Sequence, residues 1–256
     1  MRKNAPAIYV SVGLLLIWEV FARWLNEMYI LPSPTAILQK MWDFREALFT
    51  VHLPATLQVL WIGLLISIIL GIGLAIMMHL SHWSERAFYP LLVASQTIPI
   101  TALAPIFVLW FGYTIWSKVL VTVLIAFFPI AMSMFDGLRS TKRELEELMR
   151  TYGATKWQIF WKLQLPSALP QLFSAFKIAV PLSIIGAAVG EWLGAQAGLG
   201  YFSKRMMTQL DGAGVFAPIV LLSTMAIIAV FIIRIIEKNI SFGGKINAFD
   251  EIFRTM

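Results

Sequence analysis

Few side chains in this sequence could carry out chemistry, because only 13% of its 256 residues are charged and none is cysteine. His79 and His82 have HxxH spacing, but no cysteine or carboxylate pair nearby completes a set of metal ligands. The apolar segments contain no serine–histidine, paired-aspartate or HExxH arrangement. We therefore expect a protein that is not an enzyme and that holds no metal or cofactor of its own.

The sequence also lacks a site that could bind ATP. A phosphate-binding loop needs the pattern GxxxxGK followed by Ser or Thr, in which backbone amides and the lysine hold the phosphates. Gly243-Gly244-Lys245 is the nearest approach and does not have that spacing. Any energy that this protein uses must therefore come from another chain or from an ion gradient.

One polar pattern lies between two strongly apolar blocks. Glu147-Leu148-Met149 is followed after three residues by Gly153, and after nine more by Leu163-Gln164-Leu165-Pro166. A polar segment with its own helical periodicity is too ordered for a simple tether. We therefore expect a surface that docks onto a partner in water.

Residues 141–164 predict two short helices that form a hairpin. Thr141 followed by Glu144 fits a capping box, and Gly153 fits the left-handed position that ends a helix. Pro166 and Pro170 should then stop or redirect the chain. The hairpin has an acidic first turn (Glu144, Glu146, Glu147), a small tip (Tyr152, Gly153, Ala154) and an apolar face (Trp157, Phe160, Trp161).

The composition places this hairpin on an all-α integral membrane protein. Hydrophobic residues make up 59% of the chain and its mean hydropathy is +0.78, and a helix needs about 20 apolar residues to cross a bilayer. We expect one transmembrane domain over 1–256. Its six predicted spans are 7–25, 55–79, 87–111, 116–135, 172–195 and 214–236, of which the third and fifth should be the least regular.

The basic residues predict the orientation of these spans. The net charge of +6 could suggest a nucleic-acid partner, but Lys and Arg cluster at the ends of the apolar segments, as in membrane proteins. They are most frequent near both termini and in the loop 136–171, which we therefore place in the cytoplasm. The N-terminal run has no small-residue cleavage site, so we expect it to be retained as a span.

Polar residues within the third span are candidates for a solute pathway. Proline frees backbone carbonyls, and these can line a cavity. Hydrogen bonding between helices is the alternative role. The candidates are Gln96, Thr97, Pro99 and Thr101, with Pro105 nearby and Ser183 as a weaker case in the fifth span.

The fifth span carries a glycine stripe and a carboxyl group. Gly186, Gly190, Gly194 and Gly198 recur every four residues, which permits close packing within the subunit or a place along the pathway. Glu191 is acidic within a span, and so it has either a structural role or one in gating the pathway.

The segment before the second span should lie outside the cytoplasm. Its Leu31 to Thr35 stretch predicts a turn into a short amphipathic helix over 36–49, with Thr35 as a cap. Glu19 and Arg23 in the first span lie four residues apart and should pair with each other.

The hairpin pattern resembles a known motif, the "EAA" loop of permease subunits in binding-protein-dependent ABC importers. That loop reads Glu-Ala-Ala, three residues, Gly, nine residues, Ile-x-Leu-Pro; here Leu148, Met149 and Leu163 depart from it. Two further segments resemble the nitrate, sulfonate and taurine group, which includes permeases for thiamine precursors such as hydroxymethylpyrimidine. These segments are Gln96-Thr97-Ile98-Pro99 through Trp110-Phe111-Gly112, and Gly190-Glu191-Trp192-Leu193-Gly194 to Gly198-Leu199-Gly200.

This resemblance implies a type I importer permease in the cell membrane, surrounded by lipid. Two permease copies, expected to be identical, enclose one pathway. Cytoplasmic ATPase subunits, which bind ATP and Mg²⁺, receive the hairpins, and an extracytoplasmic binding protein delivers the solute. The coupling loop would then use Glu146, Glu147, Tyr152, Gly153, Ala154, Trp157, Leu163, Leu165 and Pro166.

The resemblance leaves the solute open between a sulfonate-, nitrate- or taurine-like anion and a thiamine precursor. The alternative function is a secondary transporter driven by an ion gradient. Such a protein should show internal repeats and ionisable residues at mid-span. The sequence has no convincing repeat, and its spans are nearly free of charge at mid-depth.

Overall fold

A computed structural model describes the backbone of residues 5–27 and 29–254 and the side chains of 6, 9–27 and 29–239. In this described part the regular elements are all helices. These helices include α1 (Ala5–Leu25), α2 (Pro34–Asp43), the π-helix η2 (Ala47–His52) and α10 (Leu199–Thr208). The remaining helices are α3 (Leu53–Leu80), α4 (His82–Ser95), α5 (Ile100–Phe111), α6 (Ile115–Arg139), α7 (Arg143–Thr151), α8 (Lys156–Ile159), the π-helix η3 (Phe160–Gln164), α9 (Leu165–Gly194) and α11 (Gly212–Arg254).

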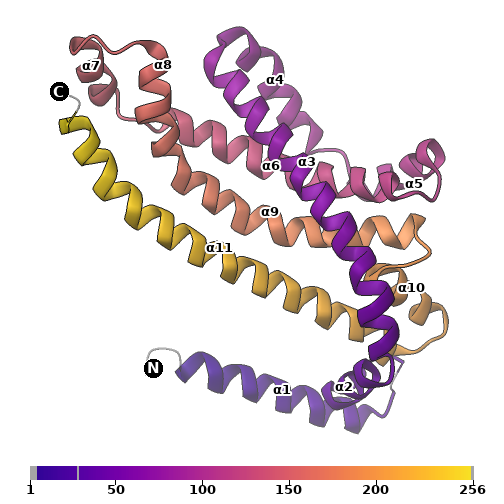
Figure 1. Ribbon diagram of the computed structural model, residues 1–256. Helices are drawn as coiled ribbons and strands as arrows, with labels where there is room; N and C mark the ends of the chain where they lie inside the picture. The colour runs from indigo at the N-terminus through magenta and orange to yellow at the C-terminus, as the bar shows by residue number, and fades with distance from the viewer. Residues whose placement is uncertain (1–4, 28, 255–256) are drawn as a thin grey trace.

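Four stretches of helix in the described residues are long and apolar enough to cross a membrane: 47–80, 115–139, 156–194 and 212–239. They run side by side in Figure 1, where α7 and α8 lie at one end of the bundle and α2 and α10 at the other. The predicted first span corresponds to α1, whose 21 residues are also sufficient in length. Most of the packing joins α6 to α9 and to α3.

Buried side chains of α3, α6 and α9 form the largest apolar core. Met134, Phe135 and Leu138 of α6 are almost fully buried there, together with Ala75 and Met78 of α3. Small residues bring these helices close to one another. A methyl group on Gly63 or Gly71 of α3 would overlap the side chains of Thr122 and Ile130 on α6.

The predicted third span, 87–111, is two helices instead of one. α4 and α5 meet at an angle of 99°. Pro99 has an extended backbone and forms the N-cap of α5, and a proline disfavours helical conformation in the residue before it. The break therefore lies at the sequence positions where prolines and polar side chains interrupt the apolar run.

The predicted fifth span is longer and more regular than its prolines suggested. The prediction that Pro166 and Pro170 stop or redirect the chain is wrong, because helix continues from Lys156 to Gly194. Pro166 directly follows the π-helix η3, and so its missing N–H falls where the backbone hydrogen bonds change from the π-helical to the α-helical pattern. Pro170 lies farther in, where packing against neighbouring helices allows a membrane helix to retain a proline.

At the end of the bundle opposite α7 and α8, α1 is fastened to α2 by a carboxylate. The predicted pairing of Glu19 with Arg23 is confirmed at 2.6 Å. Glu19 also accepts hydrogen bonds from the hydroxyl and the backbone N–H of Thr35, at 2.7 and 3.1 Å. Thr35 is therefore not the cap of α2; Ser33 is, accepting from the N–H of Ala36. Helix α2 is shorter than the predicted 36–49, since the π-helix η2 follows and leads into α3.

Candidate functional site

Two short helical segments, α7 and α8, form the predicted hairpin at the end of the bundle that carries the end of α6 and the start of α9. The predicted capping box at its start is wrong: Lys142 is the N-cap of α7, without a side-chain hydrogen bond, and the Thr141 hydroxyl donates to the carbonyl of Leu138. Glu144 and Glu146 lie in the first turn of α7, where negative charge stabilises the helix.

The turn after α7 has the geometry predicted for Gly153. Its φ is +79°, a left-handed conformation that favours glycine. The N–H of Gly153 donates to the carbonyl of Arg150, and the N–H of Ala154 donates to the carbonyl of Met149, both at 3.0 Å. This pair of bonds is the Schellman motif, which satisfies the last carbonyls of a helix by local contacts alone.

A capping box does occur, but at the second helix. Thr155 Oγ1 accepts from the N–H of Gln158 at 3.3 Å, and Gln158 Oε1 accepts from the N–H of Thr155 at 2.8 Å. Thr-x-x-Gln is the sequence signature of this motif. The signal was therefore present directly after the tip, although the capping box was predicted at Thr141 and Glu144.

The predicted aromatic face divides into a buried and an exposed part. Phe160 is 3% exposed and belongs to the large core, whereas Trp157 is 62% exposed. The Trp157 and Phe160 rings stack at 5.9 Å, and Trp161, also exposed, meets Trp157 edge-on. Phe160 thus anchors the hairpin to the bundle and orients two tryptophans toward its surface.

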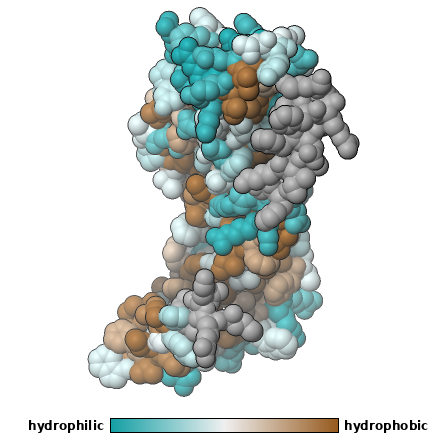
Figure 2. All heavy atoms as spheres, turned by 90° about the vertical axis from the view of Figure 1, so that its left-hand side faces the viewer, coloured by the Kyte–Doolittle hydropathy of each residue, from teal (hydrophilic) through white to brown (hydrophobic). Residues whose placement is uncertain are grey.

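Helix α7 has no buried residue and presents apolar side chains outward. Leu145, Leu148 and Tyr152 are exposed there, and Glu147 pairs with Arg143 at 2.8 Å on the same exposed helix. Among the other predicted coupling residues, Leu163 and Leu165 are half-buried and Pro166 is exposed. In Figure 2 the upper part of the face shown is mostly hydrophilic, with a hydrophobic patch among the hydrophilic atoms.

A hydrogen-bond chain, missed by the sequence analysis, fastens the hairpin to the bundle. Gln164 Nε2 donates to Glu146 Oε1 of α7 at 2.7 Å, and Gln164 Oε1 lies 2.9 Å from His79 Nε2 at the end of α3. His79 is thus hydrogen-bonded to an amide, and His82 to Glu85. Among the described residues, no group of three or more His, Cys, Asp or Glu is placed to hold a metal.

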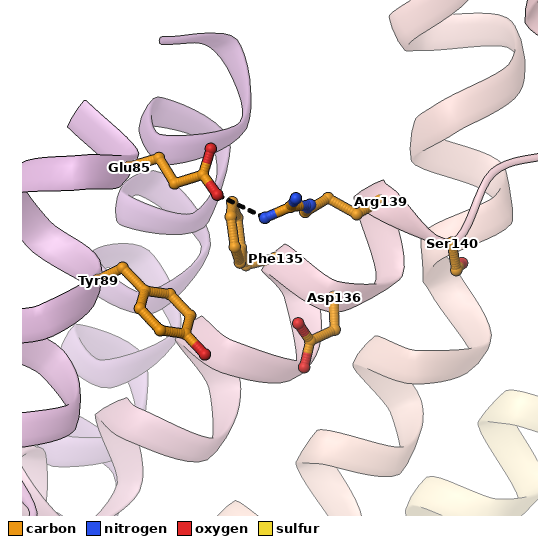
Figure 3. A pocket seen from close by; sticks show the side chains of 6 residues that line it. All are labelled: Glu85, Tyr89, Phe135, Asp136, Arg139 and Ser140. Atoms are coloured by element: carbon orange, nitrogen blue, oxygen red, sulfur yellow. Dashed lines mark hydrogen bonds and ion pairs between the residues drawn. The ribbon is translucent and has the colours of Figure 1, made fainter. Parts of the chain in front are cut away.

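Next to the hairpin, a polar hollow of about 400 Å³ opens between the start of α4 and the end of α6. Figure 3 shows the Glu85 carboxylate paired with the Arg139 guanidinium at its rim, and Asp136 on the α6 side. The Arg139 guanidinium also lies 5.1 Å from the centre of the Phe135 ring. These contacts hold the first turn of α4 against α6.

The structure separates the pathway candidates into two groups. Gln96, Thr97, Pro99 and Thr101 are exposed around the bend between α4 and α5. Gln96 also borders a mostly apolar hollow of about 250 Å³. In contrast, Ser183, Gly190 and Glu191 are buried within the bundle along α9.

Glu191 helps to hold the loop that follows α9, at the end of the bundle opposite the hairpin. Gly198, Leu199 and Gly200 donate their N–H groups to His52 Nδ1, Thr56 Oγ1 and Glu191 Oε2, at 3.1, 2.8 and 2.7 Å. We call this arrangement of His52, Thr56, Glu191 and residues 198–200 the outer cap. The sequence did not indicate His52 or Thr56, because their partners lie far away along the chain.

The glycine stripe packs within the subunit. Methyl groups added to Gly186 and Gly190 would meet the backbone of Thr122 and Lys118 on α6, and one on Gly194 would meet Val108 of α5. Gly198 lies beyond the end of α9, with a φ of +127°. The regular spacing therefore describes three packing positions and one loop position.

An ion pair beside the outer cap fastens α2 to the turn before α11. Lys40 Nζ lies 2.7 Å from Asp211 Oδ2, and the N–H of Gly214 donates to Asp211 Oδ1. Partial burial raises the pKa of Asp211, but the hydrogen bonds from Lys40 and Gly214 and the charge of Lys40 outweigh it, and the pKa is lowered from its ordinary value.

Comparisons with known proteins agree with this architecture. The family described as binding-protein-dependent transport system inner membrane component matches residues 63–242. The formylaminopyrimidine transport permease protein ThiX of Halalkalibacterium halodurans is 59% identical over 88% of this chain and 90% of its own length. The taurine transport system permease protein TauC of Escherichia coli is 26% identical over 91% of this chain and 89% of its own.

A solved structure shares the fold. The inward-facing MetNI methionine ABC transporter matches 78% of this chain and 97% of the compared chain, with a TM-score of 0.65 and 20% identity. The family match covers the hairpin, the bent α4–α5 pair and the part of the outer cap formed by Glu191 and residues 198–200. This chain therefore belongs to the family of inner membrane components of binding-protein-dependent transport systems.

Proposed function

We propose that the hairpin 143–164 of this ABC importer permease is the site at which a separate ATPase drives transport. The permease class follows from the family and its relatives. The observation that supports the site is a hairpin closed by local bonds at Gly153 and Thr155, with exposed apolar side chains on both helices. Exposed aromatic residues on a rigid, otherwise polar element are typical of a docking surface.

The continuity of helix from Lys156 to Gly194 supports a simple transmission of force. The second helix of the hairpin, which follows the tip, and residues in the middle of the membrane belong to one helical rod, which packs mainly on α6. A movement of the tip, caused by closure of the ATPase dimer, must therefore displace α9 and its partner helix. In this proposal the ATP and Mg²⁺ bind to the partner subunit, and the permease carries out no chemistry of its own.

The pathway requires a second copy of this chain in the proposed assembly. Gln96, Thr97 and Thr101 are exposed at the bend between α4 and α5, where they can face the solute across the dimer. Ser183, Gly190 and Glu191 are buried within the bundle, and so in this proposal they do not contact the solute. Six spans, with both termini and the hairpin in the cytoplasm, agree with the distribution of Lys and Arg, and the exposed apolar faces of α1 and α11 would contact lipid.

The proposed solute is a pyrimidine thiamine precursor of the formylaminopyrimidine type, delivered by an extracytoplasmic binding protein. The support is the 59% identity to a formylaminopyrimidine permease, compared with 26% to a taurine permease. Uptake of labelled formylaminopyrimidine by vesicles containing the whole complex tests this assignment. If taurine or nitrate competed for uptake and the pyrimidine did not, an anion of that kind would replace the pyrimidine as the proposed solute.

The variant Gly153→Pro tests the coupling site. Proline cannot adopt the φ of +79°, and it has no N–H group to donate to the carbonyl of Arg150. We expect normal insertion, loss of co-purifying ATPase and loss of uptake, whereas Gly153→Asn should retain all three because asparagine tolerates this conformation. Normal uptake by Gly153→Pro, or uptake without any ATPase under an ion gradient, would contradict the proposal.

A further inference from the structure

Helix α7 is held to the rest of the molecule mainly through one side chain. None of its residues is buried. In the part of the chain that the structure describes, the bond from Gln164 to Glu146 is the one side-chain hydrogen bond between α7 and another helix. The other polar contacts of the helix, Arg143 with Glu147 and Arg150 with Glu146, stay within α7. The position of α7 relative to the bundle therefore depends strongly on Gln164.

The amide of Gln164 has only one satisfactory orientation. Its NH₂ group must face Glu146, because a carboxylate accepts hydrogen bonds and cannot donate them. Its carbonyl oxygen then faces His79, so the His79 Nε2–H is the donor. Hydrogen bonds therefore run in one direction, from His79 to Gln164 to Glu146, and the last one is strengthened by the charge on its acceptor.

The hydrogen bonds from His79 through Gln164 to Glu146 connect the hairpin to a helix that does not adjoin it in the sequence. The hairpin is covalently continuous with α6 on one side and α9 on the other, whereas His79 belongs to the last turn of α3. The other end of α3 carries Thr56, which accepts the N–H of Leu199 in the outer cap. One helix thus joins the base of the hairpin to the opposite end of the bundle.

Local structure explains how Gln164 reaches both partners. It is the last residue of the π-helix η3, where the N–H of Leu165 bonds to the carbonyl of Phe160. Phe160 is buried beside the His79 ring, with ring centres 6.3 Å apart, and so fixes this turn against α3. π-Helical turns within α-helices often occur at functional sites because they reorient a side chain.

From these contacts we infer that Gln164 is a positioning residue for energy coupling, through which movement of α7 is passed to the inner end of α3. The inference rests on the proposed function of the hairpin as the ATPase site. Without this bond α7 would still contact the ATPase but would transmit its movement only along the backbone, to α6 and α9. ATP hydrolysis would then continue while less solute is moved per ATP.

A reciprocal exchange of side chains tests the hydrogen bond itself. Gln164→Glu places two carboxylates face to face and breaks the bond to Glu146. In the double variant Glu146→Gln with Gln164→Glu, the new amide donates to the new carboxylate, which also accepts from His79. The complete complex, with its ATPase and binding protein, is reconstituted in vesicles. Formylaminopyrimidine uptake and ATP hydrolysis are measured together.

We expect Gln164→Glu to lower the uptake per ATP by about tenfold, the factor typical of a lost charge-assisted hydrogen bond, while ATPase co-purification and hydrolysis persist. The double variant should recover most of the wild-type uptake per ATP. Gln39→Glu is the matched control, because it makes the same change of side chain and charge at an exposed residue of α2, outside the hairpin. Gln164→Met, neutral and similar in size, should be as impaired as Gln164→Glu.

Two results would overturn the inference: an unchanged ratio in both Gln164→Glu and Gln164→Met, or a lowered ratio that the double variant fails to recover. Poor assembly of Gln164→Glu does not obscure the answer, since Gln164→Met and the double variant report the same bond. A wild-type permease that binds no ATPase would instead remove the proposed function, and this is seen before any variant is made.

Discussion

The hairpin and the outer cap each contain a glycine with positive φ, but the surroundings of the two glycines are opposite. At the hairpin tip Gly153 has open space around it, since an added methyl group would meet nothing within 4 Å. At the outer cap a methyl group on Gly198 would overlap the carboxyl group of Glu191. Glycine is favoured at position 153 only because of the backbone conformation, whereas at position 198 a side chain would also find no space.

The hydrogen bonds of the two regions differ in the same way. The turn of the hairpin is closed by bonds between residues at most five apart, such as Ala154 to Met149. The outer cap is closed by bonds between residues 146 and 143 positions apart, from Gly198 to His52 and from Leu199 to Thr56. The turn of the hairpin therefore depends on its own sequence, whereas the outer cap depends on the tertiary structure.

The substitution Gly198→Val should have the largest effect on stability. The new side chain would be strained at a φ of +127° and would displace the Glu191 carboxyl group, two penalties that together cost about 2–6 kcal/mol. We expect a sharp fall in the melting temperature of the purified protein and in the yield of monodisperse material. A melting temperature equal to that of the wild type would show that the outer cap can rearrange freely.

A smaller loss is expected for Thr56→Val, which keeps the shape of the side chain but removes the acceptor of the Leu199 N–H. Leaving a buried donor unpaired costs about 1–3 kcal/mol, and Thr56 is fully buried. Thermal unfolding should show the decrease. The matched control is Thr224→Val, because Thr224 is exposed on α11 and bonds only within its helix. Equal melting temperatures of the two variants would argue against the importance of this bond.

For Gly153→Ala we expect a local effect. The left-handed conformation of a non-glycine residue costs about 1–2 kcal/mol, but the absence of neighbours within 4 Å confines the strain to the hairpin. Uptake should fall while the global melting temperature stays nearly unchanged. If the melting temperature fell as far as in Gly198→Val, the strain at Gly153 would not be confined to the hairpin.

The smallest effect on stability is expected for Trp157→Ala, which removes a side chain that is 62% exposed. Exposed substitutions usually change stability by no more than about 0.5 kcal/mol, yet loss of a tryptophan anchor weakens binding by about tenfold or more. A titration of ATPase against the reconstituted permease measures the difference. Trp83→Ala removes a tryptophan that is 75% exposed on α4 and should leave the affinity unchanged; equal weakening by both would remove the hairpin as the specific docking surface.

The amino-acid sequence by itself determined the class of the fold and the local form of the hairpin. Long apolar runs have no stable form in lipid except a helix, because every backbone group must be satisfied within the segment. The positive φ of Gly153 and the pairing of Glu19 with Arg23 were predictable for a similar reason, since each depends on residues within one or two turns. The same locality made the Thr155–Gln158 capping box readable in principle.

Tertiary structure alone decided what the prolines do. Pro99 stands at a sharp bend between two helices, whereas Pro170 and Pro181 lie within one long α-helix. The residue type is the same in each case, and so the difference comes from the neighbours. Helix α9 is packed against α6 along its length, and packing can compensate a missing hydrogen bond.

The partners of the buried polar groups were also decided only by the tertiary structure. Glu191 could have lined a gate or held a loop, and the folded chain places it against the N–H of Gly200. Gln164 occupied the unspecified position of its motif, and only the approach of α3 and α7 gives it two hydrogen-bond partners. A local pattern reports on neighbours within a few turns, whereas these contacts join segments that meet only after the helices pack.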